Sequence, residues 1–426
     1  MQYKDEAKAL NIKVNKKRLE NNLQALAEFG KNQNGGIDRN FGSEADFHAR
    51  KWLIEMWKKE LGAEAYIDPI ANLWVRLQGS EALKPIVLGS HHDSVKNGGR
   101  FDGALGILLA SEVLKRIKEE GLSLRHPLAI VSFSAEEPNP FNISTMGSRV
   151  SVGKVTKKQL KEAFDVNTKE KLEDAIKFVG GDVEKLENRL LNEGDLSAFI
   201  ECHIEQGRNL FDKGLSLAVV NKVTGIYREK VKVKGESNHA GTTKMEFRHD
   251  ALMAASELCL AFEKIIKSFN RPDVVGTIGW FNIEPNSANI IPGEANLIVE
   301  IRTPNSDIKE DIINKLTQCV EEIIRKREVE LQREVILNQP EVTFDETVIN
   351  ALKKASEAIN EEFMELVSMA GHDSVHMSDI TRTGMLFVKS IDGKSHCPEE
   401  FTNIEDIEKA GNALLEAVLI LDKELD

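Results

Sequence analysis

Histidine and aspartate side chains directly follow an apolar segment near residue 90. In PIVLGSHHDSVKNGGRFDG, His91 and Asp93 follow a run that reads as a buried strand. Asp102 comes eleven residues after His91, beyond a Gly98-Gly99 turn, where the next helix is expected to begin. A carboxylate at that position is suited to bridge two metal ions. A histidine and an aspartate two residues apart are also common in structural and surface positions, so this segment alone does not distinguish a metal site from a structural role.

Two further apolar segments end in the same residue types. LAIVSFSAEEP leads into Glu136 and Glu137, and FIECHIEQG brings His203 to the end of the third segment. Adjacent carboxylates point in different directions, so one can bind a metal while the other carries a proton. Such a pair is also common at a solvated helix start. Imidazole together with carboxylate ligands favours zinc, manganese, cobalt or nickel over magnesium or calcium, and the three segments together predict a metal site.

The segments that carry these residues alternate with helical patterns. Strand-like runs at 85–90, 128–134 and 198–203 are separated by a helical pattern at 103–118 and by a charged helical insert at about 157–192. This alternation predicts an α/β fold, with a catalytic domain built on a mixed, largely parallel sheet and flanking helices. Because open sheets of this kind bind ligands at the carboxyl ends of their strands, the candidate ligands are expected to meet at that edge.

The pattern changes after residue 222. Strands at 228–234, 274–280, 296–303 and 328–337 and helices at 250–269 and 306–327 follow the order β-α-β-β-α-β, as in a split, ferredoxin-like α+β unit. After Pro340 the chain continues with a helix, a strand and a closing helix. We therefore predict an inserted ferredoxin-like domain at 222–340 and a metal-binding catalytic domain formed by 1–221 and 341–426.

Composition and charge favour a globular protein that acts on small molecules. The chain has 426 residues, of which 41% are hydrophobic, enough for more than one domain. It shows no apolar run long enough to cross a membrane and no secretory signal. Its 69 acidic and 56 basic residues give a formal charge of −13, which disfavours nucleic acid and anionic membranes as partners. The four scattered cysteines indicate no disulfide scaffold, and a cytoplasmic location is expected.

The motifs, taken in order, are similar to those of a known family. GSHHDS, GGRFDG, EE, GSR, ECHIEQG, NHAGTT, PNSANIIPGE followed by IR, AGHDS and GKSHCPEE span nearly the whole chain. This series resembles the amidase, hydantoinase and carbamoylase branch of the dinuclear-zinc aminoacylase and carboxypeptidase superfamily. Members include N-carbamoyl-L-amino-acid hydrolases, allantoate amidohydrolases, ureidoglycolate amidohydrolases and β-ureidopropionases.

The resemblance implies two divalent metal ions per subunit, zinc first, with manganese, cobalt or nickel as alternatives. It makes His91 and His203 ligands of one ion, with Asp102 as the bridge. The residues alone leave His372, His376 and His396 equally open as a further ligand, and the family pattern of His396 followed by Glu400 selects His396. The implied roles are as follows: metal ligands His91, Asp102, Glu137, His203 and His396; general base Glu136; partner of the His91 ring N–H, Asp93.

The resemblance makes 1–221 and 341–426 a dinuclear metal catalytic domain and makes 222–340 a lid and dimerisation domain, and it also assigns residues of that inserted domain. His239 in NHAGTT matches a histidine that stabilises the oxyanion, in many relatives within the partner subunit of a homodimer. Asn289 and Arg302 match residues that bind the substrate carboxylate, and arginine's planar fork suits that task. Gln206 matches a position near the substrate. EEPNPF stands where relatives commonly have EEGxRF, and NHAGTTKM replaces NHAGTTPM; these departures bear on the identity of the substrate.

The implied reaction is hydrolysis of the carbamoyl C–N bond of an N-carbamoyl-L-amino acid, or of a related ureido acid such as allantoate, with release of ammonia and carbon dioxide. One alternative is an aminoacylase or dipeptidase acting on N-acyl amino acids. Another is a binding protein that has lost its chemistry, although all five ligands and the base are present. A nucleotide-binding oxidoreductase is disfavoured, because GGRFDGALG does not form GxGxxG after a strand.

Overall fold

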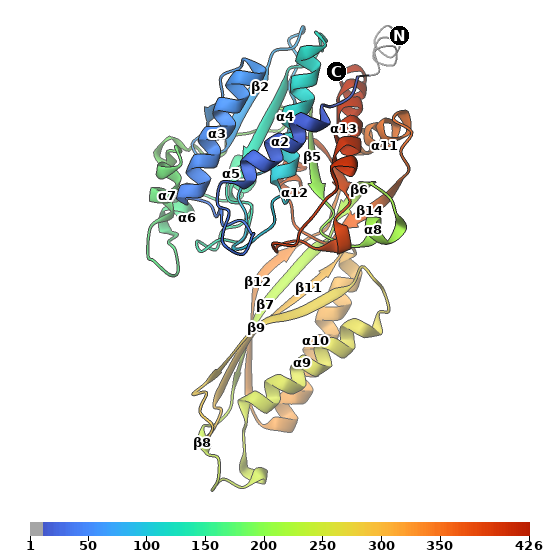
Figure 1. The fold of residues 1–426 in the computed structure, drawn as a ribbon. Helices are drawn as coiled ribbons and strands as arrows, with labels where there is room; N and C mark the ends of the chain where they lie inside the picture. Colours follow the sequence, from blue (N-terminus) through green and yellow to red (C-terminus); the bar gives the residue numbers. More distant parts are fainter. Residues whose placement is uncertain (1–11) are drawn as a thin grey trace. The chain divides into compact units, whose positions relative to one another are not determined.

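The computed structural model describes residues 12–426, which divide into two compact units (Figure 1). Unit 1 comprises the chain up to Asn221 together with Phe344–Leu366 and His372–Asp426. Unit 2 comprises Lys222–Thr343 and Val367–Gly371.

Unit 1 is built on a mixed sheet with the strand order β1-β2-β4-β3-β5-β15-β6-β13, in which β14 also pairs with β6. Its central strands β4, β3, β5 and β15 are parallel, whereas β2 and β6 run antiparallel to their neighbours. The strands are β1 (Tyr66–Ile67), β2 (Leu73–Leu77), β3 (Ile86–His91), β4 (Leu128–Phe133), β5 (Ala198–Ile204), β6 (Leu217–Val223), β13 (Val342–Thr343), β14 (Phe363–Ser368) and β15 (Arg382–Val388). The predicted α/β fold with a largely parallel sheet is confirmed.

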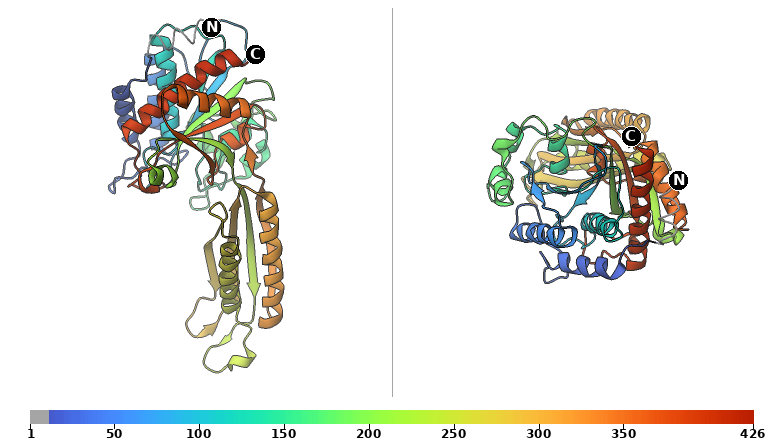
Figure 2. Two further views of the ribbon diagram at one scale, coloured as in Figure 1. Left: turned by 90° about the vertical axis from the view of Figure 1, so that its right-hand side faces the viewer. Right: turned by 90° about the horizontal axis from the view of Figure 1, so that it is seen from above.

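Every residue of β3, β4 and β5 is buried, which explains why these strands read as continuous apolar runs. One face of the sheet is covered by a layer that includes α3 (Glu44–Leu61), α4 (Ala104–Glu119) and α13 (Ile404–Glu424) (Figure 2). On the opposite face, Val87, Val131 and Phe199 pack with Met377 of α12 (Ser374–Met377). The further helices are α2 (Lys16–Ala27), α5 (Met146–Ser151), α8 (Asn209–Lys213), α11 (Glu346–Ala358) and η3 (Ile391–Gly393).

Two parts of unit 1 differ from the sequence expectation. The insert at about 157–192 holds only short helices, α6 (Lys157–Glu162), α7 (Leu172–Phe178) and η1 (Val183–Lys185), because its apolar residues are spaced to fill a small core around Leu160 and Ile176. Strands β1, β2, β6, β13 and β14 were not predicted. They are short or interrupted by polar residues, such as Arg76 in β2 and Asn221 and Lys222 in β6, so their apolar runs are shorter than those of the central strands.

Unit 2 carries the order β-α-β-β-α-β in a sheet with the strand order β12-β7-β11-β9, antiparallel throughout. The apolar faces of its two long helices pack on the sheet around Val231, Leu258, Val299 and Leu316. Its elements are β7 (Gly225–Lys234), β8 (Asn238–His239), η2 (Met245–Phe247), α9 (Ala251–Ser268), β9 (Val275–Glu284), β10 (Ile290–Ile291), β11 (Glu294–Thr303), α10 (Ser306–Arg327) and β12 (Glu330–Gln339).

Within residues 12–426, no helix combines the length and the apolarity that crossing a membrane requires.

Candidate active site

The candidate ligands of unit 1 meet at the carboxyl ends of the parallel strands. His91 is the last residue of β3, Glu136 and Glu137 follow β4 by three and four residues, and His203 is the second-last residue of β5. They form three overlapping groups of potential metal ligands: His91, Asp102 and His203; His91, Glu136 and Glu137; Asp102, Glu137 and His396. In each group the ligand atoms lie within 4.8 Å of one another, so the structure brings six of the predicted site residues together.

Asp102 lies at the centre of the cluster, and its two oxygens face different histidines. Its Oδ1 lies 3.2 Å from Nε2 of His203 and 3.5 Å from Nε2 of His91. Its Oδ2 lies 3.4 Å from Nε2 of His396, which is in turn 3.6 Å from Oε1 of Glu137. This is the geometry of a carboxylate placed between two ligand sets.

The ring orientation of the two strand-end histidines is set by main-chain carbonyls. Nδ1 of His91 lies 3.0 Å from the carbonyl oxygen of Asp93, and Nδ1 of His203 lies 2.9 Å from that of Ile204. In the neutral rings a donating Nδ1–H leaves the lone pair on Nε2, the nitrogen that faces Asp102.

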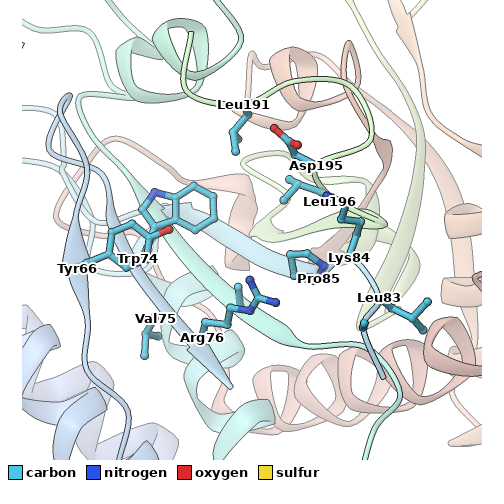
Figure 3. A pocket seen from close by; sticks show the side chains of 12 residues that line it. Tyr66, Trp74, Val75, Arg76, Leu83, Lys84, Pro85, Leu191, Asp195 and Leu196 are labelled. Carbon is cyan, nitrogen blue, oxygen red and sulfur yellow. The ribbon is translucent and has the colours of Figure 1, made fainter. Parts of the chain in front are cut away.

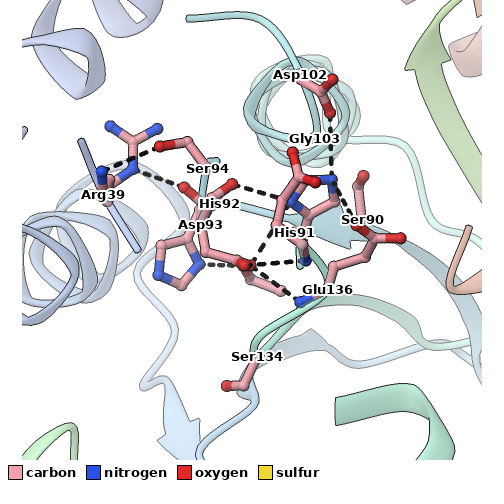
Figure 4. Close-up of polar contacts among 12 residues, drawn as sticks. Arg39, Ser90, His91, His92, Asp93, Ser94, Asp102, Gly103, Ser134 and Glu136 are labelled. Atoms are coloured by element: carbon pink, nitrogen blue, oxygen red, sulfur yellow. Dashed lines mark hydrogen bonds and ion pairs between the residues drawn. The ribbon is translucent and has the colours of Figure 1, made fainter. Parts of the chain in front are cut away.

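The Asp93 side chain has a different contact from the one expected. Its Oδ1 lies 3.6 Å from Nδ1 of His91, farther than the main-chain carbonyl. Its oxygens accept the main-chain N–H of Glu136 at 3.3 Å (Figure 4) and that of Glu137 at 3.2 Å. Asp93 therefore joins the end of β3 to the loop that carries the glutamate pair.

His92 points away from the cluster. Its Nε2 lies 2.8 Å from Asp46 and its Nδ1 lies 2.6 Å from the hydroxyl of Ser132. Its carbonyl oxygen accepts a hydrogen bond of 2.6 Å from the buried guanidinium of Arg39 (Figure 4). These contacts hold the backbone between His91 and Asp93 in place without using a ligand atom of the cluster.

The site gathers more carboxylate charge than its surroundings neutralise. Burial raises the pKa of Glu137 to about 8, with the nearby Asp102 adding to the effect. Burial also raises the pKa of Glu136 well above its usual range, against the opposing effect of His91. Asp102 is different, because the facing imidazoles, His203 first, outweigh its burial and hold its pKa well below the usual range.

These residues fit divalent cations. The Oε1 atom of Glu137 is buried and has no hydrogen-bond partner among the described residues, and a bare buried carboxylate oxygen is unfavourable without a cation or donor. The imidazole and carboxylate donors are the types that zinc and its transition-metal neighbours prefer.

Gln206 and Ser395 reach the same carboxylate. Nε2 of Gln206 donates to Oδ2 of Asp102 at 2.8 Å, and the Ser395 hydroxyl lies 2.9 Å from the same oxygen. Gln206 has a positive φ of 58° and His396 one of 57°, a conformation that non-glycine residues adopt at a cost when the surroundings impose it. Sequence reasoning did not single out Ser395, and the only signal was its position beside His396.

The remaining predicted site residues belong to unit 2. Nδ1 of His239 accepts the main-chain N–H groups of Gly241 and Thr242 at 3.0 and 3.1 Å, which places the proton of the neutral ring on Nε2. The carbonyl of Asn289 accepts the N–H of Ala240 at 3.0 Å, so His239 and Asn289 are neighbours.

Arg302 lies at the other end of β11. It bonds to Glu300 at 2.7 Å and to the carbonyl of Met369 at 2.8 Å. β8, which ends in His239, and β10, which follows Asn289, lie beyond the Glu294 end of β11. Glu294 and Arg302 are eight residues apart, roughly 26 Å along a strand at about 3.3 Å per residue. Unit 2 therefore does not bring Arg302 to Asn289.

A pocket of about 450 Å³ in unit 1 lies at the opposite ends of the same strands (Figure 3). It is lined by Trp74, Arg76, Pro85, Leu196 and their neighbours. Pro85 directly precedes β3, and Leu196 lies two residues before β5. Its lining shares no residue with the candidate site.

Comparisons with known proteins agree with this arrangement. Peptidase family M20/M25/M40 matches residues 87–420. The chain is 34% identical over 394 residues to a ureidoglycolate hydrolase of Oryza sativa subsp. japonica, which covers 91% of this chain and 81% of that protein. It is 32% identical over 411 residues to an N-carbamoyl-L-amino-acid amidohydrolase of Pseudomonas sp. (strain NS671), with coverage of 96% and 99%.

The fold is shared with a crystal structure of an amidase of the hydantoinase/carbamoylase family from Burkholderia multivorans, at a TM-score of 0.86 and 31% identity over 96% of this chain and 98% of that one. The chain thus belongs to the M20/M25/M40 family, and the resemblance to its hydantoinase/carbamoylase branch is confirmed. It is an enzyme, a hydrolase of carbon–nitrogen bonds other than peptide bonds.

Proposed function

We propose that this enzyme binds two divalent cations and hydrolyses the carbamoyl C–N bond of N-carbamoyl-L-amino acids or of a related ureido acid such as allantoate, releasing ammonia and carbon dioxide. The observation that carries the proposal is the placement of Asp102, whose Oδ1 faces His91 and His203 while its Oδ2 faces His396. His91 and His203 would hold one cation, Glu137 and His396 the other, and Asp102 would bridge them.

Two cations held this way lower the pKa of water and polarise a carbonyl group. Glu136 supplies the proton transfer. It lies beside Glu137 but faces His91 at 3.7 Å, and its raised pKa suits a group that takes a proton from water and returns it to the leaving nitrogen.

Unit 2 supplies the groups that recognise substrate. Arg302 is suited to hold a carboxylate through its fork, and Nε2–H of His239 is suited to donate to the developing oxyanion. Because Arg302 lies far along β11 from His239 and Asn289, we propose a homodimer in which one subunit contributes Arg302 and its partner contributes His239 and Asn289 to each site. Unit 2 would then serve both as a lid and for dimerisation.

The substrate class is tested with purified enzyme stripped of metal and reloaded with zinc, manganese or cobalt. N-carbamoyl-L-amino acids, N-carbamoyl-β-alanine, ureidoglycolate and allantoate are assayed for ammonia, and N-acetyl amino acids and dipeptides for free amine. Ammonia release from a ureido acid, stereoselective where the substrate is chiral, is expected. Amine release from N-acetyl substrates alone would assign the aminoacylase alternative instead, and no turnover with any metal would leave the binding-protein alternative.

A further inference from the structure

We propose that Glu400 is a positioning residue that holds the Asp102 loop and the His396 loop in register, and that it thereby sets the affinity of the metal position formed by Asp102, Glu137 and His396. The proposal rests on the proposed function, since it concerns the metal pair assigned above.

The Glu400 side chain contacts main-chain groups of the loop that carries Asp102. Its Oε1 accepts the N–H of Phe101 at 2.9 Å and of Asp102 at 3.1 Å. These two N–H groups lie in the loop that leads into α4, just before its N-cap Gly103. Glu400 is 3% exposed. Its buried carboxylate therefore fixes the backbone at Asp102.

The other oxygen of Glu400 connects to the His396 loop. The Ser395 hydroxyl lies 2.9 Å from Oε2 of Glu400 and 2.9 Å from Oδ2 of Asp102. One serine thus lies between the two carboxylates, next to His396 in the chain. The His396 side chain is 46% exposed and has a positive φ of 57°, so packing alone constrains it less than the buried His91 and His203. The Glu400 and Ser395 contacts supply that constraint.

The absence of a side chain at Gly99 provides the space that the Glu400 carboxylate occupies. A Cβ atom built on Gly99 would lie 2.0 Å from the Cδ atom of Glu400, so any larger residue there has to displace the Glu400 side chain. Gly99 has no positive φ, and its glycine is therefore explained by the space that Glu400 occupies.

The two metal positions depend on Glu400 unequally. Two of the three ligands of the Asp102, Glu137 and His396 position lie in segments that Glu400 contacts. At the other position, formed by His91, Asp102 and His203, only Asp102 lies in a segment that Glu400 contacts. The two histidines there come from β3 and β5. Loss of Glu400 should therefore weaken metal binding more at the Asp102, Glu137 and His396 position than at the position of His91 and His203.

The test uses the full chain as wild type, Glu400→Gln and Gly99→Ala. Glu399→Gln is the matched control, because Glu399 is the exposed neighbour in the same loop. Metal-free proteins are titrated with Zn²⁺ against a chromophoric chelator, and with Co²⁺ by visible absorption. Circular dichroism and thermal unfolding of the metal-free proteins report whether each variant folds.

We expect wild type and Glu399→Gln to bind two ions, and Glu400→Gln to bind one of them about 10–100-fold less tightly, with the other binding step unchanged. Gly99→Ala keeps the glutamate but displaces it, so the same selective loss in a folded Gly99→Ala protein supports the proposal even where Glu400→Gln unfolds. Wild-type affinity for both ions in folded Glu400→Gln, or an equal loss at both steps, overturns the proposal and leaves the proposed function standing. Failure of the wild-type chain to bind two ions overturns the dinuclear assignment itself.

Discussion

The Asp93 carboxylate accepts the main-chain N–H of Glu137 at 3.2 Å, so the strand that ends in His91 is joined to the loop that carries the glutamate pair. The N–H of Glu136 reaches the same carboxylate. Replacing Asp93 with alanine leaves both buried N–H groups without this acceptor and should let the glutamates drift. We expect kcat to fall roughly 10–100-fold, together with metal affinity. Steady-state kinetics and metal content measure the effect. An unchanged kcat would show that the contacts of Asp93 with the glutamate N–H groups are not needed for activity.

Glu136 and Glu137 should separate cleanly in their effects. Glu136→Gln is expected to keep both metal ions and lose activity by about 10²–10⁴-fold, because an amide cannot carry the proton. Glu137→Gln should instead lose one ion, because an amide is a poorer ligand than a carboxylate. Metal content by mass spectrometry and turnover of the best ureido substrate are compared side by side. If the two variants behave alike, the assigned division of labour is wrong.

The histidine and aspartate ligands predict a graded loss of metal. His396→Ala removes a ligand from one position and should leave one tightly bound ion per chain. Asp102→Ala removes the bridge and should weaken both positions. The exposed His48, which lies beside Glu44 on α3, supplies the control His48→Ala, for which full occupancy is expected. Two ions retained by His396→Ala would argue for a different fifth ligand.

Metal binding should strengthen as pH rises toward 9. A hydrogen bond to Asp102 raises the pKa of His396 to about 9, against the opposing effect of burial, and the pKa of Glu137 is about 8. In the metal-free protein both groups therefore bind protons at neutral pH, and a cation has to displace those protons. Calorimetric titrations in buffers of different ionisation enthalpy should show proton release at pH 7 that declines above pH 9. An affinity independent of pH between 6 and 9 contradicts this.

The raised pKa of His396 also determines how the stability of the metal-free protein changes with pH. A histidine with a raised folded-state pKa stabilises the metal-free protein fully below the unfolded value of about 6.5, and this contribution is lost as pH rises through about 9. His396 is nearly half exposed, so the effect should be small. Thermal unfolding of the metal-free wild type and His396→Ala across pH 6–10 checks it: the difference between them should narrow at high pH, and a difference that widens has the wrong sign.

Sharing of the site between subunits can be tested by mixing two inactive variants. Arg302→Ala and His239→Ala should each lose most activity as homodimers. In a mixed dimer one site carries both defects and the other carries neither, so random exchange of subunits should restore about a quarter of the wild-type activity. Separate proteins are denatured, mixed and refolded together, and each variant refolded alone is the control. If a subunit uses its own His239 with its own Arg302, mixing restores nothing.

The sequence by itself determined the central strands, the long helices and the identity of the chemical groups. Continuous apolar runs that lead to His91, Glu136 and His203 read as buried strands, and their alternation with helical patterns predicted a parallel sheet whose strands share a carboxyl edge. Both signals are local in the sequence. The ferredoxin-like order of unit 2 was visible for the same reason.

Strands such as β2 and β6, and the true extent of the insert helices, depended on partners distant in sequence, which no local pattern reports. Only the tertiary structure decided the contacts that set the site. They are the approach of both Asp102 oxygens to different histidines, the turn of Asp93 toward the glutamate backbone, and the burial of Glu400 against Gly99. Asp93 and Glu137 are 44 residues apart in the chain and Asp102 and Ser395 are 293 apart. The packing of the whole sheet sets how such distant segments meet.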